Sequence, residues 1–167
     1  YRMGFEWAIN NNFENIIEMD ADFSHSFDDL KNLINNYSDV SALIGSRYID
    51  GGQTIGWEKS RLLLSIYANK FAKFMSRSSI NDMTSGFRII NCKTLVDIEY
   101  ETSKSNGYAF QIEILARILN IGSSVKEIPI IFHERRRGKS KLERKIIYEA
   151  LLLVVSLGFK SLFKIFK

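Results

Sequence analysis

The chain has 167 residues, of which 46% are hydrophobic and 13% aromatic. This length and composition fit one domain with a buried core and exclude a wholly disordered chain. The single cysteine, Cys92, excludes an internal disulfide. The formal net charge is +4, and no segment has the ~20 consecutive apolar residues that a membrane-spanning helix needs.

Hydrophobic periodicity predicts helices and strands in alternation. In chain order, the expected elements are a helix over 1–11, a strand over 15–19, a helix from 26 or 28 to 36, a strand over 40–44, a helix over 58–75, an irregular to extended segment over 83–90, a helix over 110–119, a strand over 125–132 and a helix over 140–167. Pro129 predicts an edge strand, because proline has no N–H for a sheet hydrogen bond. The alternation predicts an α/β sheet with helices on both faces.

Two of these helices carry apolar residues that we expect to face the core. They are Phe27, Leu30, Leu33 and Ile34 in the first, and Leu62, Ile66, Phe71 and Phe74 in the second. Trp7, Trp57 and the other phenylalanines are also expected mainly in the core.

Asp20-Ala21-Asp22 directly follows the apolar strand over 15–19. Ligands bind at the carboxyl ends of strands in an α/β sheet, so both carboxylates are expected at that rim. Magnesium-type cations are held by one or two carboxylates together with substrate phosphates. Asp20 and Asp22 therefore predict a divalent-metal site that holds a phosphate-bearing substrate. The alternative is that they cap the next helix or form a turn.

A phosphate clamp is expected near the same rim. Arg47 follows the strand over 40–44, and Arg61 and Ser65 are four residues apart on the next helix, so they share a face. Guanidinium and hydroxyl groups together suit a phosphate. The alternative is a surface arginine beside a solvent-exposed serine.

The segment 135–145 is strongly basic, with Glu143 as its only acidic residue. Arg135 and Lys141 lie on either side of the flexible Gly138. They are expected to close over a diphosphate, the arginine as a fork and the lysine as a point charge. The cluster also suits an anionic membrane surface or nucleic acid, and a solvated basic face is the alternative.

The segment 146–167 is predicted to form an amphipathic helix. One stripe is basic and another is bulky and apolar, namely Lys160, Lys164 and Lys167 against Phe159, Leu162, Phe163 and Phe166. This pattern is typical of a helix at the interface of an anionic bilayer. A helix packed against protein is the alternative.

Five motifs occur in order along the chain. They are Glu18-Met19-Asp20-Ala21-Asp22-Phe23-Ser24-His25, Gly45-Ser46-Arg47-Tyr48, Thr84-Ser85-Gly86-Phe87-Arg88, Gly107-Tyr108-Ala109-Phe110-Gln111-Ile112-Glu113 and Glu134-Arg135-Arg136-Arg137-Gly138-Lys139-Ser140-Lys141. Through their order and spacing the chain resembles the polyprenol-phosphate (dolichol-phosphate) mannosyltransferases of glycosyltransferase family 2. The resemblance covers nearly the whole chain.

The resemblance implies a GT-A fold, which is a Rossmann-like nucleotide-sugar domain. It implies that Asp22 is a metal ligand and that Asp20 and Ala21 contact the donor or the metal. It also implies that Arg135 and Lys141 bind the diphosphate of the donor.

For the acceptor, the resemblance implies that Arg47, Arg61 and Ser65 grip its phosphate. It assigns no role to Gln111 or Glu113.

Two early strands of the family, one with a Pro-x-Tyr-x-Glu segment and one with an aspartate, have no counterpart in this sequence. We therefore expect an N-terminally truncated GT-A catalytic domain over 1–145 and the amphipathic helix over 146–167. Whether this part of the enzyme is active by itself is left open.

The resemblance implies transfer of a hexose, preferentially mannose from GDP-mannose, to a polyprenol or dolichol monophosphate. Transfer is expected to invert the sugar carbon and to use Mg²⁺ or Mn²⁺. The expected partners are the nucleotide-sugar donor, the lipid phosphate and a membrane surface, without nucleic acid. The expected location is the cytoplasmic face of a membrane, as a peripheral or tethered protein.

Two alternatives remain open. One is a polyprenol-phosphate glucosyltransferase or aminosugar transferase of the same fold. The other is a non-catalytic basic module that binds anionic lipid or nucleic acid.

Overall fold

The computed structural model describes residues 1–134 and 151–156. Its elements in chain order are α1 (Arg2–Asn10), β1 (Asn15–Glu18), α2 (Phe27–Asn35), β2 (Ala42–Ser46), β3 (Gln53–Ile55), α3 (Lys59–Met75), β4 (Arg88–Asn91), α4 (Cys92–Asp97), a 3-10 helix η1 (Tyr100–Thr102), α5 (Gly107–Asn120), β5 (Val125–Pro129) and β6 (Ile131–His133). Residues 151–156 are also helical. Arg135, Lys141 and most of the predicted C-terminal helix lie outside the described residues, so the predictions made for them remain predictions.

The main sheet has the strand order β1-β4-β2-β5. Strand β4 runs antiparallel to both β1 and β2, whereas β5 runs parallel to β2. Strands β1, β2 and β5 therefore point the same way, and their carboxyl ends meet at one rim. Pro129 lies in the edge strand β5, opposite Ser46, which confirms its predicted position.

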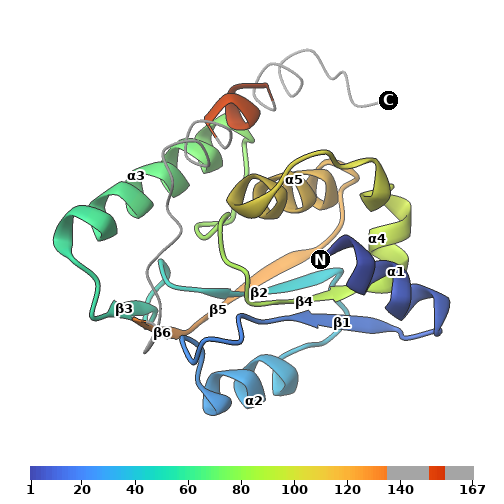
Figure 1. The fold of residues 1–167 in the computed structure, drawn as a ribbon, viewed down its shortest axis with the longest axis horizontal. Coiled ribbons are helices and arrows are strands. Elements are labelled where there is room, and N and C mark those ends of the chain that lie inside the picture. Colours follow the sequence, from blue (N-terminus) through green and yellow to red (C-terminus); the bar gives the residue numbers. More distant parts are fainter. Residues whose placement is uncertain (135–150, 157–167) are drawn as a thin grey trace.

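Helices cover both faces of this sheet (Figure 1). Helix α2 lies on one face, and α1, α4 and α5 lie on the other. Ser26 caps α2, because its hydroxyl accepts a hydrogen bond from the Asp29 amide at 2.9 Å. Asp28 and Asp29 in the first turn suit the positive end of the helix dipole.

The two faces have separate apolar clusters. The larger one joins α1, α4 and α5 to the sheet and includes Phe5, Ile44, Ile90, Leu95 and Leu115. The smaller one lies under α2 and includes Leu33, Leu43, Phe87, Ile89 and Ile130. Burial of these side chains fixes the sheet rim from which the site residues extend.

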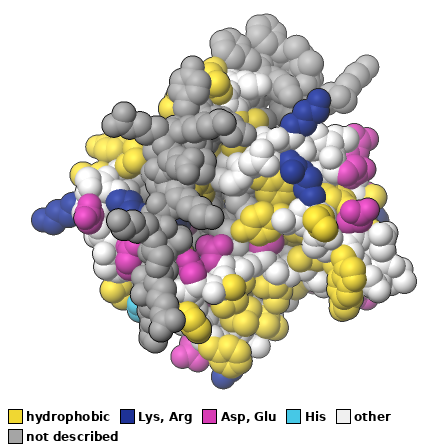
Figure 2. Space-filling view, viewed as in Figure 1, with side chains coloured by type: hydrophobic (Ala, Val, Ile, Leu, Met, Phe, Trp, Pro, Cys, Tyr) yellow, Lys and Arg dark blue, Asp and Glu magenta, His cyan; other side chains and the backbone are white. Residues whose placement is uncertain are grey.

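Several residues predicted to be inward are exposed. Phe27 and Ile34 of α2, Phe71 and Phe74 of α3, and Trp7 of α1 all face solvent. Figure 2 shows hydrophobic side chains on the surface over α2 and at the side of the molecule where α3 lies. The 3.6-residue spacing of apolar residues shows which side chains share one face of a helix. It does not show which of those side chains pack against the rest of the protein.

Other local features were not predicted. The expected strand over 125–132 is broken at Ile130, whose N–H donates to the Ser46 carbonyl and whose carbonyl accepts from the Gln53 amide. The residues beyond it form β6, which pairs with β3. Strand β3 and helix α4 had no predicted counterpart. Within 1–134 and 151–156, no helix combines the length and hydrophobicity required to cross a bilayer.

Candidate active site

Two adjoining cavities open at the carboxyl rim of the sheet. The first, called here the polar cavity, has a volume of about 340 Å³. The second, the apolar cavity, has a volume of about 330 Å³. They share a wall made by Arg47, Trp57, Arg61, Thr84 and Tyr108.

Arg47 in the shared wall forms a buried ion pair with Asp82. Its Nε and Nη2 atoms each donate to an Asp82 carboxylate oxygen at 2.7 Å, and its backbone N–H donates to the same carboxylate at 3.0 Å. Burial opposes the charged form of Asp82, but the Arg47 guanidinium outweighs it and holds the pKa of that carboxyl below its usual range. Arg47 is therefore fixed in place before any ligand arrives.

Arg61 in the same wall is held by two partners. Its Nη1 atom donates to both carboxylate oxygens of Glu134, at 2.7 and 3.0 Å. Its guanidinium carbon lies 4.0 Å from the ring centre of Trp57, over which Arg47 also lies at 5.5 Å. Trp57 thus contacts both of the arginines that were predicted to form a clamp, and each arginine also contacts a carboxylate.

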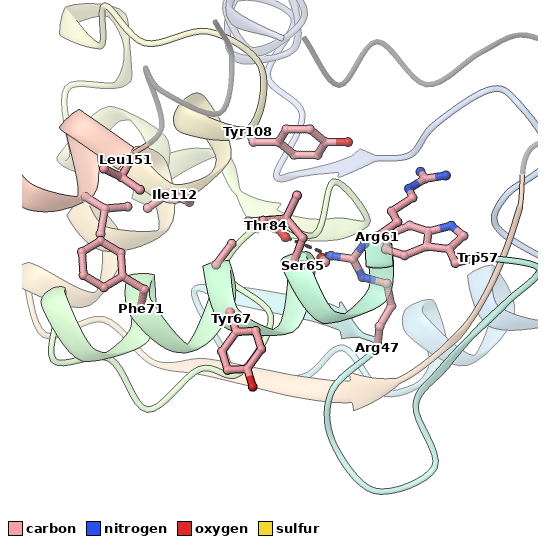
Figure 3. A pocket seen from close by; sticks show the side chains of 13 residues that line it. Arg47, Trp57, Arg61, Ser65, Tyr67, Phe71, Thr84, Tyr108, Ile112 and Leu151 are labelled. Atoms are coloured by element: carbon pink, nitrogen blue, oxygen red, sulfur yellow. Dashed lines mark hydrogen bonds between the residues drawn. The ribbon is translucent and has the colours of Figure 1, made fainter. Parts of the chain in front are cut away.

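Ser65 lines the apolar cavity beside the two arginines. Tyr48 donates a hydrogen bond to its hydroxyl oxygen at 2.7 Å. Figure 3 shows Arg47, Arg61 and Trp57 at one end of this cavity, and Phe71 and Leu151 at the other. The cavity is therefore cationic at one end and hydrocarbon at the other.

The aspartates of the Asp-Ala-Asp motif differ in their surroundings. Asp20 lines the polar cavity. Asp22 accepts hydrogen bonds from the amide and the hydroxyl of Ser24, at 3.1 and 2.5 Å. Ala21 between them is exposed. The motif follows β1 at the rim, where the sequence placed it.

Gly86 marks the floor of the polar cavity. A Cβ atom at this glycine would lie 3.6 Å from the Tyr1 hydroxyl, 3.8 Å from Asp20 Oδ1 and 3.9 Å from Gln111 Nε2. Polar atoms from three separate segments therefore surround one small space, which the missing side chain of Gly86 leaves open.

Two buried polar side chains, Gln111 and Glu18, lie near this floor. Gln111 lines the polar cavity, and its amide interacts with the Glu18 carboxylate and the Tyr1 hydroxyl. Burial raises the pKa of Glu18 to about 7, although the nearby Arg88 guanidinium lowers it. Arg88 itself is buried and donates to the carbonyls of Ser85 and Gln111 at 2.6 and 2.9 Å.

His25 packs at the side of the polar cavity. Its ring stacks on Phe87 with 4.5 Å between the ring centres and meets the edge of Phe132. Its Nε2 atom is 3.9 Å from Asp20 Oδ2. Burial lowers the pKa of His25, although Asp20 opposes this change, so the ring is neutral near pH 7.

The polar cavity contains oxygen ligands of the kind that bind divalent cations. Within the described part of the chain, no group of three or more His, Cys, Asp or Glu side chains could hold a metal. Carboxylate, amide and hydroxyl oxygens together are nevertheless the ligands of hard cations, which also keep waters and substrate phosphates. Of the oxygen ligands, Asp20 and Gln111 line the polar cavity, whereas Asp22, two residues after Asp20, accepts hydrogen bonds from Ser24.

Sequence reasoning missed part of this site. Asp82 and Tyr108 were given no role and Trp57 was expected mainly in the core, because the importance of all three depends on which arginines they meet in space. Gln111 was within a quoted motif but had no assigned partner. Glu113 of the same motif is structural: it accepts from Ser103 and Arg117, each at 2.7 Å.

Comparison with curated proteins identifies close relatives. The chain is 38% identical over 162 residues to polyprenol monophosphomannose synthase of Mycolicibacterium smegmatis, covering 96% of this chain and 61% of that protein. It is 33% identical over 161 residues to undecaprenyl-phosphate mannosyltransferase of Micrococcus luteus, covering 96% of this chain and 66% of that protein. The chain thus spans less than two thirds of the length of these relatives. No family model matches it.

Solved structures of low sequence identity share the fold. Glucosyl-3-phosphoglycerate synthase of Mycobacterium tuberculosis, in complex with Mn²⁺, UDP-glucose and phosphoglyceric acid, superposes with a TM-score of 0.65 at 9% identity, over 93% of this chain and 53% of that one. A second structure of that enzyme, with phosphoglyceric acid, gives a TM-score of 0.60 at 10% identity, over 90% and 53%. This likeness confirms the predicted GT-A fold.

Proposed function

Because this chain belongs to the polyprenol-phosphate mannosyltransferase family of glycosyltransferase family 2, we propose that it transfers mannose from a nucleotide sugar to a polyprenyl monophosphate. The observation that carries the proposal is the junction of the two cavities. An acceptor with an anionic head and a hydrocarbon tail fits the apolar cavity, whose head end carries Arg47, Arg61 and Ser65. The donor then occupies the polar cavity on the other side of the shared wall.

The reaction needs no strong base in the protein. A phosphate monoester is largely dianionic at neutral pH, because its second pKa is ~6. Its oxygen forms a bond to the sugar carbon as the bond from that carbon to the nucleoside diphosphate breaks. The nucleoside diphosphate leaves with the electron pair, and attack from the opposite side inverts the carbon. This chemistry agrees with a neutral His25 that packs between aromatic rings.

The residues of this chain then act by position and charge. Asp82 holds Arg47 rigidly, so that the shared wall keeps its shape. Arg61 exchanges the Glu134 carboxylate for the acceptor phosphate, because both anions compete for the same guanidinium edge. Arg135 and Lys141 are assigned to the donor diphosphate by the family motif.

We include a divalent cation, Mg²⁺ or Mn²⁺, in this proposal. Asp22 and Asp20 would hold it, with Gln111 as a further ligand. When bound, it would neutralise the charge that develops on the leaving diphosphate. We further propose that the donor is GDP-mannose. The protein is proposed to be peripheral or tethered at the cytoplasmic face of a membrane.

The test is a transfer assay on the protein with a panel of labelled sugar nucleotides. We expect label from GDP-mannose in the lipid phosphate fraction, only with Mg²⁺ or Mn²⁺ present. Preferred transfer from UDP-glucose or a UDP-aminosugar would instead indicate a glucosyltransferase or aminosugar transferase of the same fold. Metal-independent binding of anionic lipid without transfer, fading steeply with salt, would instead indicate a basic binding module.

A further inference from the structure

Helix α3 carries Arg61 of the shared wall and Ser65 beside it, but little of the helix is buried. Of its 17 residues, only Asn69 and Ala72 are buried, and Asn69 has 2% of its surface exposed. Asparagine is among the weaker helix formers, and a buried amide costs free energy unless it is hydrogen-bonded. The partners of Asn69 therefore show what this residue does for the helix.

Asn69 uses both ends of its amide. Its Nδ2 atom donates to the Ser65 carbonyl and to the Thr84 hydroxyl oxygen, each at 3.0 Å. Its Oδ1 atom accepts from the Thr84 backbone N–H at 3.2 Å. Thr84 lies outside α3, in the segment that leads to β4. The amide therefore ties α3, at the level of Ser65, to the segment over 82–84.

Thr84 continues the connection to Arg47. Its hydroxyl oxygen accepts from Arg47 Nη2 at 2.9 Å (Figure 3). Because Asn69 and Arg47 both donate to this oxygen, its own proton is left for Asp82 Oδ1, 3.4 Å away. Asp82 is the carboxylate that holds Arg47. A single hydroxyl group thus joins Arg47 to α3.

We propose that Asn69 is a positioning residue, which holds α3 and its phosphate-binding side chains at a fixed place relative to Arg47. The inference rests on the proposed function, in which one acceptor phosphate contacts both. Arg47 follows β2 and is fixed by Asp82, whereas Arg61 and Ser65 move with the helix. One phosphate can contact both groups only if their spacing is kept. Asn69 itself lines neither cavity and acts through Thr84.

The test measures steady-state transfer while the acceptor and the donor are varied in turn. Asn69→Leu replaces the amide by an apolar group of similar size. We expect the KM for polyprenyl phosphate to rise about tenfold, because the phosphate loses a charged contact when α3 shifts. The KM for the nucleotide sugar should change less than about twofold, because Asp20 and Gln111 of the polar cavity lie outside α3.

Thr84→Val and Thr84→Ser test the same connection from its other end. Valine keeps the shape of the side chain but removes the hydroxyl that accepts from Asn69 and Arg47, whereas serine keeps it. The acceptor KM should rise roughly tenfold in Thr84→Val and stay within about twofold in Thr84→Ser. Asn69→Leu and Thr84→Val combined should raise it no further than either alone, because both remove one connection.

Ala72→Gly is the matched control for stability. Ala72 is the other buried residue of α3 and lies one turn after Asn69. Glycine weakens a helix but removes no side-chain hydrogen bond here. Ala72→Gly should therefore lower the midpoint of thermal unfolding and leave the acceptor KM unchanged. If Asn69→Leu does not fold, the two Thr84 variants decide the matter by themselves.

Three results would overturn the positioning role. The first is an unchanged acceptor KM in folded Asn69→Leu. The second is an acceptor KM that rises in step with lost thermal stability in every variant, Ala72→Gly included, which would make Asn69 a stabilising residue only. The third is additive effects of Asn69→Leu and Thr84→Val, because Asn69 would then act independently of Thr84.

The fluorescence of Trp57 separates this proposal from the proposed function. The chain has two tryptophans, so Trp7→Phe leaves only Trp57, which contacts both arginines of the shared wall. Without ligand, Asn69→Leu should shift its emission to longer wavelength and Ala72→Gly should not. This shift without transfer by the unchanged protein would retain the positioning and remove the function. Transfer with neither a shift nor a changed acceptor KM would retain the function and remove the positioning.

Discussion

The two cavities share one wall but differ in what they present to a ligand. The polar cavity has polar groups at its floor, such as Asp20 and Gln111. The apolar cavity is lined mainly by aliphatic and aromatic side chains, and the charged residues among its described lining lie at the shared wall. Under the proposed function, this contrast places the reaction at the shared wall, with the charged donor on the polar side and the amphiphilic acceptor on the apolar side.

The largest expected effect is on the polar side. Asp22→Ala in the full-length enzyme should lower metal-dependent turnover about 10³-fold, because the leaving diphosphate loses its charge stabilisation. Initial rates with Mg²⁺ and Mn²⁺ measure the effect. Ser24→Ala is the control, since it removes a hydrogen bond to Asp22 and keeps the carboxylate. Full metal-dependent activity in Asp22→Ala would remove this aspartate from the metal site.

The next effect concerns the wall itself. Asp82→Asn should lower the free energy of unfolding by about 3–5 kcal/mol, because it leaves the Arg47 charge buried without its partner. Denaturant titration measures the change. Glu134→Gln breaks the more exposed ion pair of Arg61 and should cost less than about 1 kcal/mol. Equal losses in the two variants would show that the wall is not rigid at Arg47.

Glu18 is expected to make the free energy of unfolding depend on pH. Burial raises its pKa in the folded protein from 4.5 to about 7, so the folded state binds the proton more tightly than the unfolded state. The contribution of Glu18 to stability should therefore be greatest below pH 4.5 and fall by about 3 kcal/mol as the pH rises from 4.5 through 7. Glu18→Gln should remove this fall. Unfolding at several pH values, with a chelator present, tests it, and an unchanged slope in the variant would exclude Glu18 as the cause.

The smallest expected effect is on the KM for the acceptor. Glu134→Gln removes the anion that competes with the acceptor phosphate for Arg61. The KM for polyprenyl phosphate should fall roughly two- to fivefold, with little change in the KM for the nucleotide sugar. A Glu127→Gln variant, which changes a carboxylate that binds the backbone of Asn81 and Asp82, is the comparison. A higher acceptor KM in Glu134→Gln would mean that Glu134 orients Arg61 for binding.

Much of the fold followed from the sequence by itself. The order of the main helices and strands, the edge position of Pro129 and the place of Asp20 and Asp22 after a strand were predictable, because they depend on local periodicity and on backbone chemistry. The resemblance of five ordered motifs added the GT-A fold and the family. These features are encoded within short windows of the chain.

The tertiary structure decided what each charged residue meets. Arg47 and Arg61 were correctly expected near one rim, but their pairing with Asp82 and Glu134 joins segments that are distant in sequence. The exposure of Phe71 and Phe74 likewise depends on where α3 lies against the sheet. Helical spacing sets which residues share a face, whereas only packing decides whether that face meets other parts of the protein or remains exposed.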